Sequence, residues 1–243
     1  MNRDPGESLC FALDVPDREA ARDLVTRLAG TVGLFKVGLE LFVSEGPSLL
    51  REMAGWGAAK IFLDLKLHDI PRTVLGACRS AGRAPVELLS VHAEALWQSG
   101  RSRDRSISEA GPRLLGITVL TSVADQDLEP LGYARGLSVS ELVVLRASIA
   151  REAGCAGVVC SGREVGLIRK RLGADLLVLA PGIRPEWALV SGDDQSRVRT
   201  AYGAIREGAD YVVVGRPIRD APDPREAAAR IVEEIERGYR DRG

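Results

Sequence analysis

The segment Asp64–Pro71, with the sequence DLKLHDIP, carries the residues best suited to chemistry. It continues the apolar run Ile61–Leu63, which predicts a buried β-strand, and side chains two residues apart on a strand share a face. Asp64 and Lys66 are therefore expected to project together. Burying a carboxylate and an ammonium group is costly unless the two are paired. The pattern indicates either a structural ion pair that closes a strand or a charged active site.

The elements that must position these charges alternate between strands and helices. Apolar runs predict eight strands, at Leu9–Leu13, Leu34–Val37, Ile61–Leu65, Leu88–Val91, Leu114–Val119, Gly157–Val159, Leu176–Leu179 and Tyr211–Val214. Helices are expected to begin near Asp17, Pro47, Pro71, Ala95, Ser138, Arg163, Arg197 and Asp223. Short strands joined by helices imply parallel pairing, because a parallel pair needs a crossover. Eight such units in 243 residues predict an α/β fold, a (β/α)8 TIM barrel, as a single domain spanning 1–243.

The carboxyl ends of barrel strands form the usual active-site face. The predicted strands place Asp14 after the first, Lys36 on the second, and Asp64 and Lys66 at the end of the third. Neighbouring strands thus supply negative and positive charges in alternation at one mouth. This arrangement favours a preorganised electrostatic site over a single structural ion pair.

A second signal follows the last strand, in the sequence VVVGRPI. The loops after strands seven and eight of such barrels often bind phosphate. Gly215 would let the backbone approach an anion closely, and Arg216 would supply a forked, permanently charged partner. The alternative is a tight turn with a surface arginine.

Several polar residues are interpreted as structural. His92 ends the fourth strand and His68 lies beside the charged motif, so both are expected to be packing residues more than catalytic ones. The last helix has apolar residues at helical spacing, and Glu233, Glu234 and Glu236 are expected to lie mostly on its solvent side.

Composition excludes several classes of function. The formal net charge of −1 provides no basic field for nucleic acid. Cys10, Cys78, Cys155 and Cys160 form no CxxC pair, so they are expected to be small buried hydrophobes and not metal ligands or disulfides. The N-terminus is polar, and no apolar run approaches the ~20 residues that span a bilayer. A cytoplasmic protein without a membrane or nucleic-acid partner is expected.

Taken together, the motifs resemble the orotidine 5'-phosphate decarboxylase family, of the bacterial type. The resemblance runs nearly end to end. It rests on FALDVP around Asp14, FKVG around Lys36, FLDLKLHDIPRT from Phe62 to Thr73, VHA at His92, GITVLTS from Gly116 to Ser122, GVVCS at Gly157, APGIRP at Ala180, DDQ ending at Gln195, and VVGRPI at Val213.

The resemblance implies cofactor-independent decarboxylation of orotidine 5'-monophosphate to UMP and CO2, the last step of de novo UMP biosynthesis. Lys66 would protonate C6 of the pyrimidine, and Asp64 would face the departing carboxylate. Asp69 and Thr73 would reach the neighbouring subunit's site in a homodimer with shared active sites. No metal or cofactor is implied. The catalytic residues would be Lys36, Asp64, Lys66 and Asp69.

The same resemblance assigns the contacts to the substrate. Asp14 and Lys36 would hold ribose hydroxyls. Thr121, together with Ser122, would contact the base. The phosphate would be held by Arg184, Gln195, Gly215 and Arg216.

Two segments depart from the family's usual pattern. After VHA this chain has Glu94-Ala95-Leu96, where small residues including glycine are common in the family. The segment between Arg184 and Gln195 is longer than usual and carries Trp187. Neither departure removes a residue of the implied site.

Two alternatives remain open at this point. Sugar-phosphate decarboxylases and aldolases of the same superfamily, of the ketogulonate-phosphate and hexulose-phosphate type, resemble this chain in the DxKxxD strand. They use Mg²⁺ and an acidic residue on strand two, where this chain has Lys36. A non-catalytic phosphate-binding barrel is the other alternative, and it predicts loss of Asp64 or Lys66, both of which are present.

Overall fold

Eight parallel strands close into a barrel in which each strand is hydrogen-bonded to the next and β8 pairs with β1. The computed structural model describes residues 4–100, 111–188 and 199–242. The strands are β1 (Leu9–Ala12), β2 (Leu34–Val37), β3 (Ile61–Leu67), β4 (Val86–Val91), β5 (Arg113–Ile117), β6 (Gly157–Val159), β7 (Leu177–Ala180) and β8 (Tyr211–Val214). The predicted α/β class and (β/α)8 barrel are confirmed.

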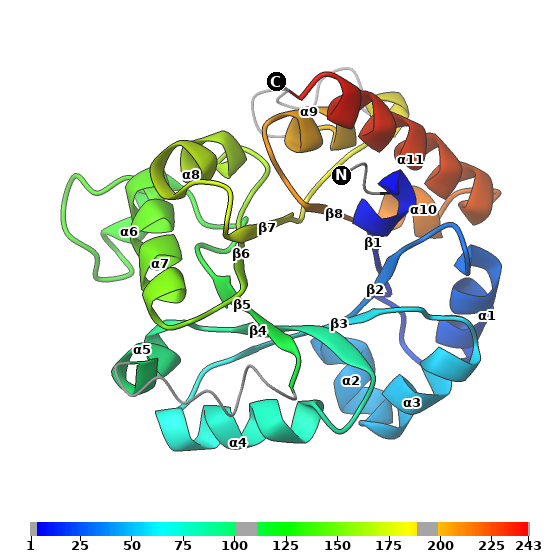
Figure 1. Ribbon diagram of the computed structural model, residues 1–243, viewed down its shortest axis with the longest axis horizontal. Coiled ribbons are helices and arrows are strands. Elements are labelled where there is room, and N and C mark those ends of the chain that lie inside the picture. The colour runs from blue at the N-terminus through cyan, green and yellow to red at the C-terminus, as the bar shows by residue number, and fades with distance from the viewer. Residues whose placement is uncertain (1–3, 101–110, 189–198, 243) are drawn as a thin grey trace.

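Helices form an outer ring around the strands (Figure 1). They are α1 (Arg18–Leu28), α2 (Leu39–Glu45), α3 (Ser48–Gly55), α4 (Pro71–Ala81), α5 (Glu94–Gly100), α6 (Asp125–Leu128), α7 (Val139–Glu152), α8 (Val165–Leu172), α9 (Ala201–Arg206), α10 (Arg216–Arg219) and α11 (Pro224–Arg240), with short 3-10 turns η1 (Pro5–Ser8) and η3 (Glu186–Ala188). Capping side chains define where three of these helices begin. Asp17, Ser138 and Asp223 each accept a hydrogen bond from the first turn of the helix that follows. No helix in the described ranges is long and apolar enough to cross a membrane.

The buried side chains divide into two layers. The larger layer lies between the strands and the helices. The smaller fills the barrel interior and includes Cys10, Leu34, Phe62, Leu115 and Leu179. This apolar inner layer therefore packs directly beneath the polar groups at the carboxyl ends of the strands.

Some predicted boundaries differ from the observed ones. α2 was not expected, and the helix predicted near Arg197 begins at Ala201, where the side chain of Thr200 caps the first turn. Residue 197 itself lies outside the described residues. β3 runs two residues beyond the expected Leu65, to Leu67.

Glu234 is buried, so the expectation that it faces solvent is wrong. It is 4% exposed, and its Oε1 accepts a hydrogen bond of 2.9 Å from the backbone N–H of Glu186. Burial raises the pKa of this carboxyl group above its usual range. Glu233 and Glu236 are exposed as expected, so periodicity placed two of the three correctly.

Arg169 joins three elements at the amino ends of the strands. Its guanidinium group lies 2.6 Å from Oδ2 of Asp210 and donates to the carbonyl oxygens of Gly208 and Leu176 at 2.8 and 2.5 Å. The same carboxylate oxygen accepts from the backbone N–H of Val178 at 2.8 Å. One arginine therefore fixes α8 against the starts of β7 and β8, on the face of the barrel that serves stability.

We expect Arg169→Ala to lower the free energy of unfolding by about 2–4 kcal/mol, because it removes several charge-assisted hydrogen bonds and leaves Asp210 without this cation. Arg171→Ala on the same helix is the matched control, since Arg171 is exposed, and it should change stability by less than about 0.5 kcal/mol. Urea denaturation of both variants measures the difference. Equal losses in the two variants would contradict this role.

Candidate active site

Two ion pairs lie at the carboxyl ends of β1, β2 and β3. Lys36 Nζ donates to Asp14 Oδ1 at 2.8 Å, and Lys66 Nζ donates to Asp64 Oδ2 at 2.6 Å. Lys36, Asp64 and Lys66 line one cavity of about 170 Å³, which Thr121 also lines. The structure thus brings together the charges that the strand ends predicted.

A bulge in β3 brings Asp64 and Lys66 into contact. Leu63 is paired with Leu89 of β4, and Leu67 with Val91, so three residues of β3 lie opposite the single residue Ser90. Lys66 takes up this excess in the left-handed region, with φ of 51°, a conformation that costs a non-glycine residue about 1–2 kcal/mol. A regular strand was expected here, in which alternation alone would place the two side chains on one face. In the structure, a bulge brings them together instead.

Ser90 is a site residue that the sequence analysis missed. It is fully buried; its Oγ donates to Asp64 Oδ1 at 2.8 Å and accepts from the backbone N–H of Lys66 at 2.8 Å. The only signal in the sequence is a small polar residue inside the apolar run of β4, two residues before His92.

The rest of the cavity is apolar. Phe62, Ile117, Val159 and Leu179 contribute to its walls. Cys160 is a further wall residue, and burial raises the pKa of its thiol, so the thiol stays protonated. A bound group that displaces water from between such walls would feel a fixed charge more strongly than it does in water.

All four cysteines are free and buried, as the sequence predicted. Burial is the largest cause of the raised pKa of each thiol, which reaches about 11 at Cys78 and about 12 at Cys155. Cys10 lies beneath the charged site, and the pKa of its thiol is also raised, mainly by burial. The thiols are therefore neutral packing groups at physiological pH.

Gly215 lies close to the first ion pair. A Cβ atom there would come within 3.3 Å of the Ala12 Cβ and 3.9 Å of Asp14 Oδ2, so a side chain would crowd this end of β1. Gly215 is the N-cap residue of α10, and the exposed Arg216 is the first residue of that helix. Arg184, in the loop after β7, is half-buried, and its backbone N–H donates to the carbonyl of Arg199. Gln195 lies outside the described residues.

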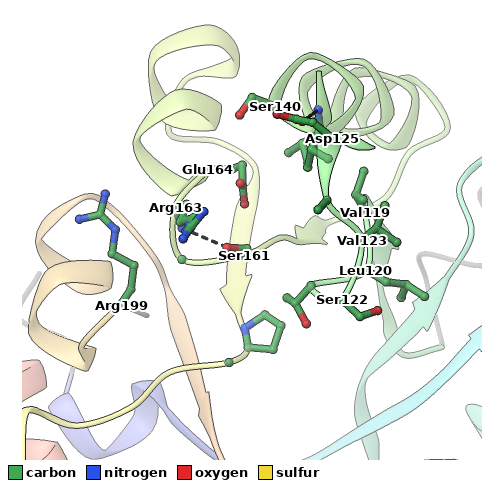
Figure 2. Close-up of a pocket in the computed structure, with 17 residues that line it drawn as sticks. Val119, Leu120, Ser122, Val123, Asp125, Ser140, Ser161, Arg163, Glu164 and Arg199 are labelled. Atoms are coloured by element: carbon green, nitrogen blue, oxygen red, sulfur yellow. Dashed lines mark hydrogen bonds between the residues drawn. The ribbon is translucent and has the colours of Figure 1, made fainter. Parts of the chain in front are cut away.

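A second cavity, of about 330 Å³, adjoins the first. The two share Val119–Thr121 and Pro181 as lining residues, and Ser122 lines only the second. Figure 2 shows Ser161 and Glu164 on one side of this space and Leu120 and Ser122 on the other. Glu164 is buried, and desolvation raises the pKa of its carboxyl group. Of the two residues predicted to contact the base, Thr121 therefore lines both cavities and Ser122 lines only the 330 Å³ cavity.

Arg146 supports the loop that carries Thr121. Its guanidinium group donates to the carbonyl of Thr118 at 2.6 Å and to the Tyr133 hydroxyl at 2.7 Å, and it pairs with Glu94 at 3.0 Å. Glu94 is the residue that departs from the usual small residues after VHA. Here it links the end of β4, through Arg146, to the end of β5.

His68 and His92 stack on each other, with ring centroids 4.5 Å apart and an interplanar angle of 21°. Burial lowers the pKa of His92, and the neighbouring His68 lowers it further, so His92 is neutral at physiological pH. This geometry agrees with a packing role for both rings.

Asp69 and Thr73 lie away from the cavity of their own chain. Both are exposed, and neither lines the 170 Å³ cavity. Asp69 Oδ1 accepts from the backbone N–H of Ile70 at 2.6 Å, and Ile70 is 67% exposed beside it. The structure of one chain therefore does not bring these two residues to Lys66.

Comparison with known proteins agrees with the fold and the motifs. A family model for the Orotidine 5'-phosphate decarboxylase / HUMPS family matches residues 7–231. An orotidine 5'-phosphate decarboxylase from Desulfosudis oleivorans is 45% identical over 97% of this chain and 95% of its own length. One from Anaeromyxobacter dehalogenans is 47% identical over 93% of this chain and 97% of its own length.

A solved structure supports the same assignment. The crystal structure of orotidine 5'-phosphate decarboxylase from Lactobacillus acidophilus superimposes with a TM-score of 0.80 at 33% identity, covering 93% of this chain and 98% of that one. The family resemblance inferred from the motifs is confirmed, as is the prediction of an enzyme. With the barrel, the charged mouth and these relatives in agreement, the chain belongs to the Orotidine 5'-phosphate decarboxylase / HUMPS family.

Proposed function

We propose that this protein decarboxylates orotidine 5'-monophosphate to UMP and CO2 in pyrimidine biosynthesis, without a cofactor. Membership of the family supports this activity. The observation that carries the proposal is the contact of 2.6 Å between Lys66 and Asp64 in a small cavity with apolar walls. A fixed ammonium group in such a cavity is suited to a reaction that develops negative charge on carbon.

The chemistry follows from where the charge goes. When the bond from C6 to the carboxylate breaks, its electron pair stays on C6, and no ring π-system is aligned to absorb it. Lys66 stabilises that carbanion and then transfers a proton from Nζ to C6, which gives UMP; solvent restores the proton to Lys66. Asp64 faces the substrate carboxylate, and departure of CO2 relieves the repulsion between the two negative groups.

The remaining site residues are proposed to hold parts of the substrate that do not react. Lys36 and Asp14 would bind ribose hydroxyls, and Thr121 with Ser122 would contact the base. Binding energy at these distant groups, and at the phosphate, can force the substrate carboxylate against Asp64. The phosphate contacts are proposed to be Arg184, Gln195, Gly215 and Arg216.

The proposal includes a homodimer. Asp69 and Thr73 would enter the neighbouring subunit's site, and the exposed position of both on a single chain supports this. The exposed Ile70 between them would be covered by the same contact. A cytoplasmic enzyme with one barrel domain over 1–243, and without a nucleic-acid or membrane partner, completes the proposal.

The second candidate is a Mg²⁺-dependent sugar-phosphate decarboxylase or aldolase, because the matching family model also covers the HUMPS group. Strand two argues against it. Lys36 occupies the position where those enzymes would carry an acidic residue, and its ammonium group already pairs with Asp14. A cation there would repel Mg²⁺.

Lys66→Ala should abolish turnover of orotidine 5'-monophosphate and leave UMP binding measurable by calorimetry, because the variant loses the proton donor but keeps the groups proposed for ribose and phosphate. Lys60→Ala is the matched control, since Lys60 pairs with Glu7 at the opposite end of the barrel. It should keep turnover close to that of the wild type. Normal activity of Lys66→Ala would remove Lys66 as the proton donor.

Mixing two inactive variants tests the shared site. In a heterodimer of Asp64→Ala and Asp69→Ala subunits, one site loses both carboxylates and the other regains both. Activity should therefore appear on mixing, at about half of the wild-type value per heterodimer and about a quarter per dimer in an equal mixture, in which about half of the dimers are heterodimers. Mixed and unmixed samples are compared by the loss of orotate absorbance. Heterodimers that form without recovering activity would count against contribution across the dimer.

A further inference from the structure

The position of Ser90 in the barrel makes it a bridge between Asp64 and Lys66. It lies on the same face of β4 as Leu88, whose side chain fills the barrel interior, and it is fully buried. It is the one residue of β4 that lies opposite three residues of β3, Asp64, Leu65 and Lys66. Ser90 is therefore the residue of β4 placed directly against the bulge.

The hydrogen bonds of Ser90 match what a hydroxyl group can offer. Oγ has one proton to donate, which goes to Asp64 Oδ1 at 2.8 Å, and it accepts from the Lys66 backbone N–H at 2.8 Å. The bulge takes Lys66 out of register with β4, and the Ser90 hydroxyl accepts its backbone N–H there. Neither alanine nor valine could make either bond.

The two bonds act on the two ends of the ion pair. The hydrogen bond from Ser90 to Asp64 Oδ1 holds the carboxylate so that its Oδ2 accepts from Lys66 Nζ. The other holds the backbone of Lys66 in its left-handed conformation, with φ of 51°. Because a residue in this region relaxes unless its surroundings hold it, the direction in which the Lys66 side chain leaves the strand depends on this contact.

We propose that Ser90 is a positioning residue for decarboxylation, which sets the relative placement of Asp64 and Lys66 without touching the reacting atoms. This inference rests on the proposed function and deepens it. A hydroxyl group at residue 90 is required for the chemical step and contributes little to binding of the ribose and the phosphate.

The test compares Ser90→Ala with wild type for decarboxylation of orotidine 5'-monophosphate and for UMP affinity. We expect kcat to fall about 10- to 100-fold, because displacements on the order of 1 Å in a reacting site have effects of this size. The Kd for UMP should change by less than about threefold, as expected for loss of an interaction that acts only in the transition state. Ser90→Thr, which keeps the hydroxyl, should recover most of kcat.

Ser8→Ala is the matched control. Ser8 is also fully buried, and its Oγ lies 2.5 Å from the Tyr239 hydroxyl at the other end of the barrel. This variant should lower the thermal midpoint and leave kcat unchanged. A double variant adds a second readout: Ser90→Ala should lower kcat by a smaller factor in an Asp64→Ala background than in the wild-type background, because only the bond to the Lys66 backbone is left to lose.

The outcomes separate this inference from the proposed function. If the wild-type protein leaves orotidine 5'-monophosphate unchanged, the proposed function is wrong. An active wild type with full kcat in Ser90→Ala overturns the role of Ser90 alone. A folded Ser90→Thr that binds UMP but is as slow as Ser90→Ala also overturns it. If Ser90→Ala loses its cooperative thermal transition, Ser90→Cys, with similar size and a weaker donor, takes its place under the same criteria.

Discussion

The alternation of charge around the mouth of the barrel is the constraint on which the rest of the site depends. Asp14, Lys36, Asp64 and Lys66 follow one another on three adjacent strands, and each charge has an opposite partner within 2.8 Å. Asp64 is buried and Lys36 and Lys66 are half-buried, so these charges have lost part of their hydration and are tolerable only when paired. The pairing also sets the site before a substrate arrives, so little reorganisation is needed during the reaction.

The backbone of β3 is distorted to satisfy that constraint. A regular strand would continue the ladder with β4, whereas the bulge places three residues opposite Ser90 and puts Lys66 at positive φ. Such strain persists where the surrounding structure holds it in place, and it commonly marks a functional site. The amino ends of the strands show the contrast, since the Arg169 contacts there join regular elements and lie away from the cavity.

Sequence periodicity predicted the barrel well, because eight apolar runs separated by helical patterns leave few other arrangements. It also predicted the charged strand ends, since each charge directly follows or ends such a run. It could not predict the bulge, because register depends on the neighbouring strand and not on β3 alone. Ser90 was missed for that reason: its importance appears only opposite Asp64 and Lys66. Glu234 was misplaced because helical spacing ignores the backbone N–H of Glu186 that its carboxylate accepts.

In the proposed reaction, fixed protein charges carry out the decarboxylation without a metal. The most direct test follows the ultraviolet absorbance of orotidine 5'-monophosphate with the purified protein and excess EDTA. We expect the orotate band to fall while UMP accumulates in equal amount. An unchanged spectrum from folded, dimeric protein, together with turnover of sugar phosphates once Mg²⁺ is restored, would contradict it.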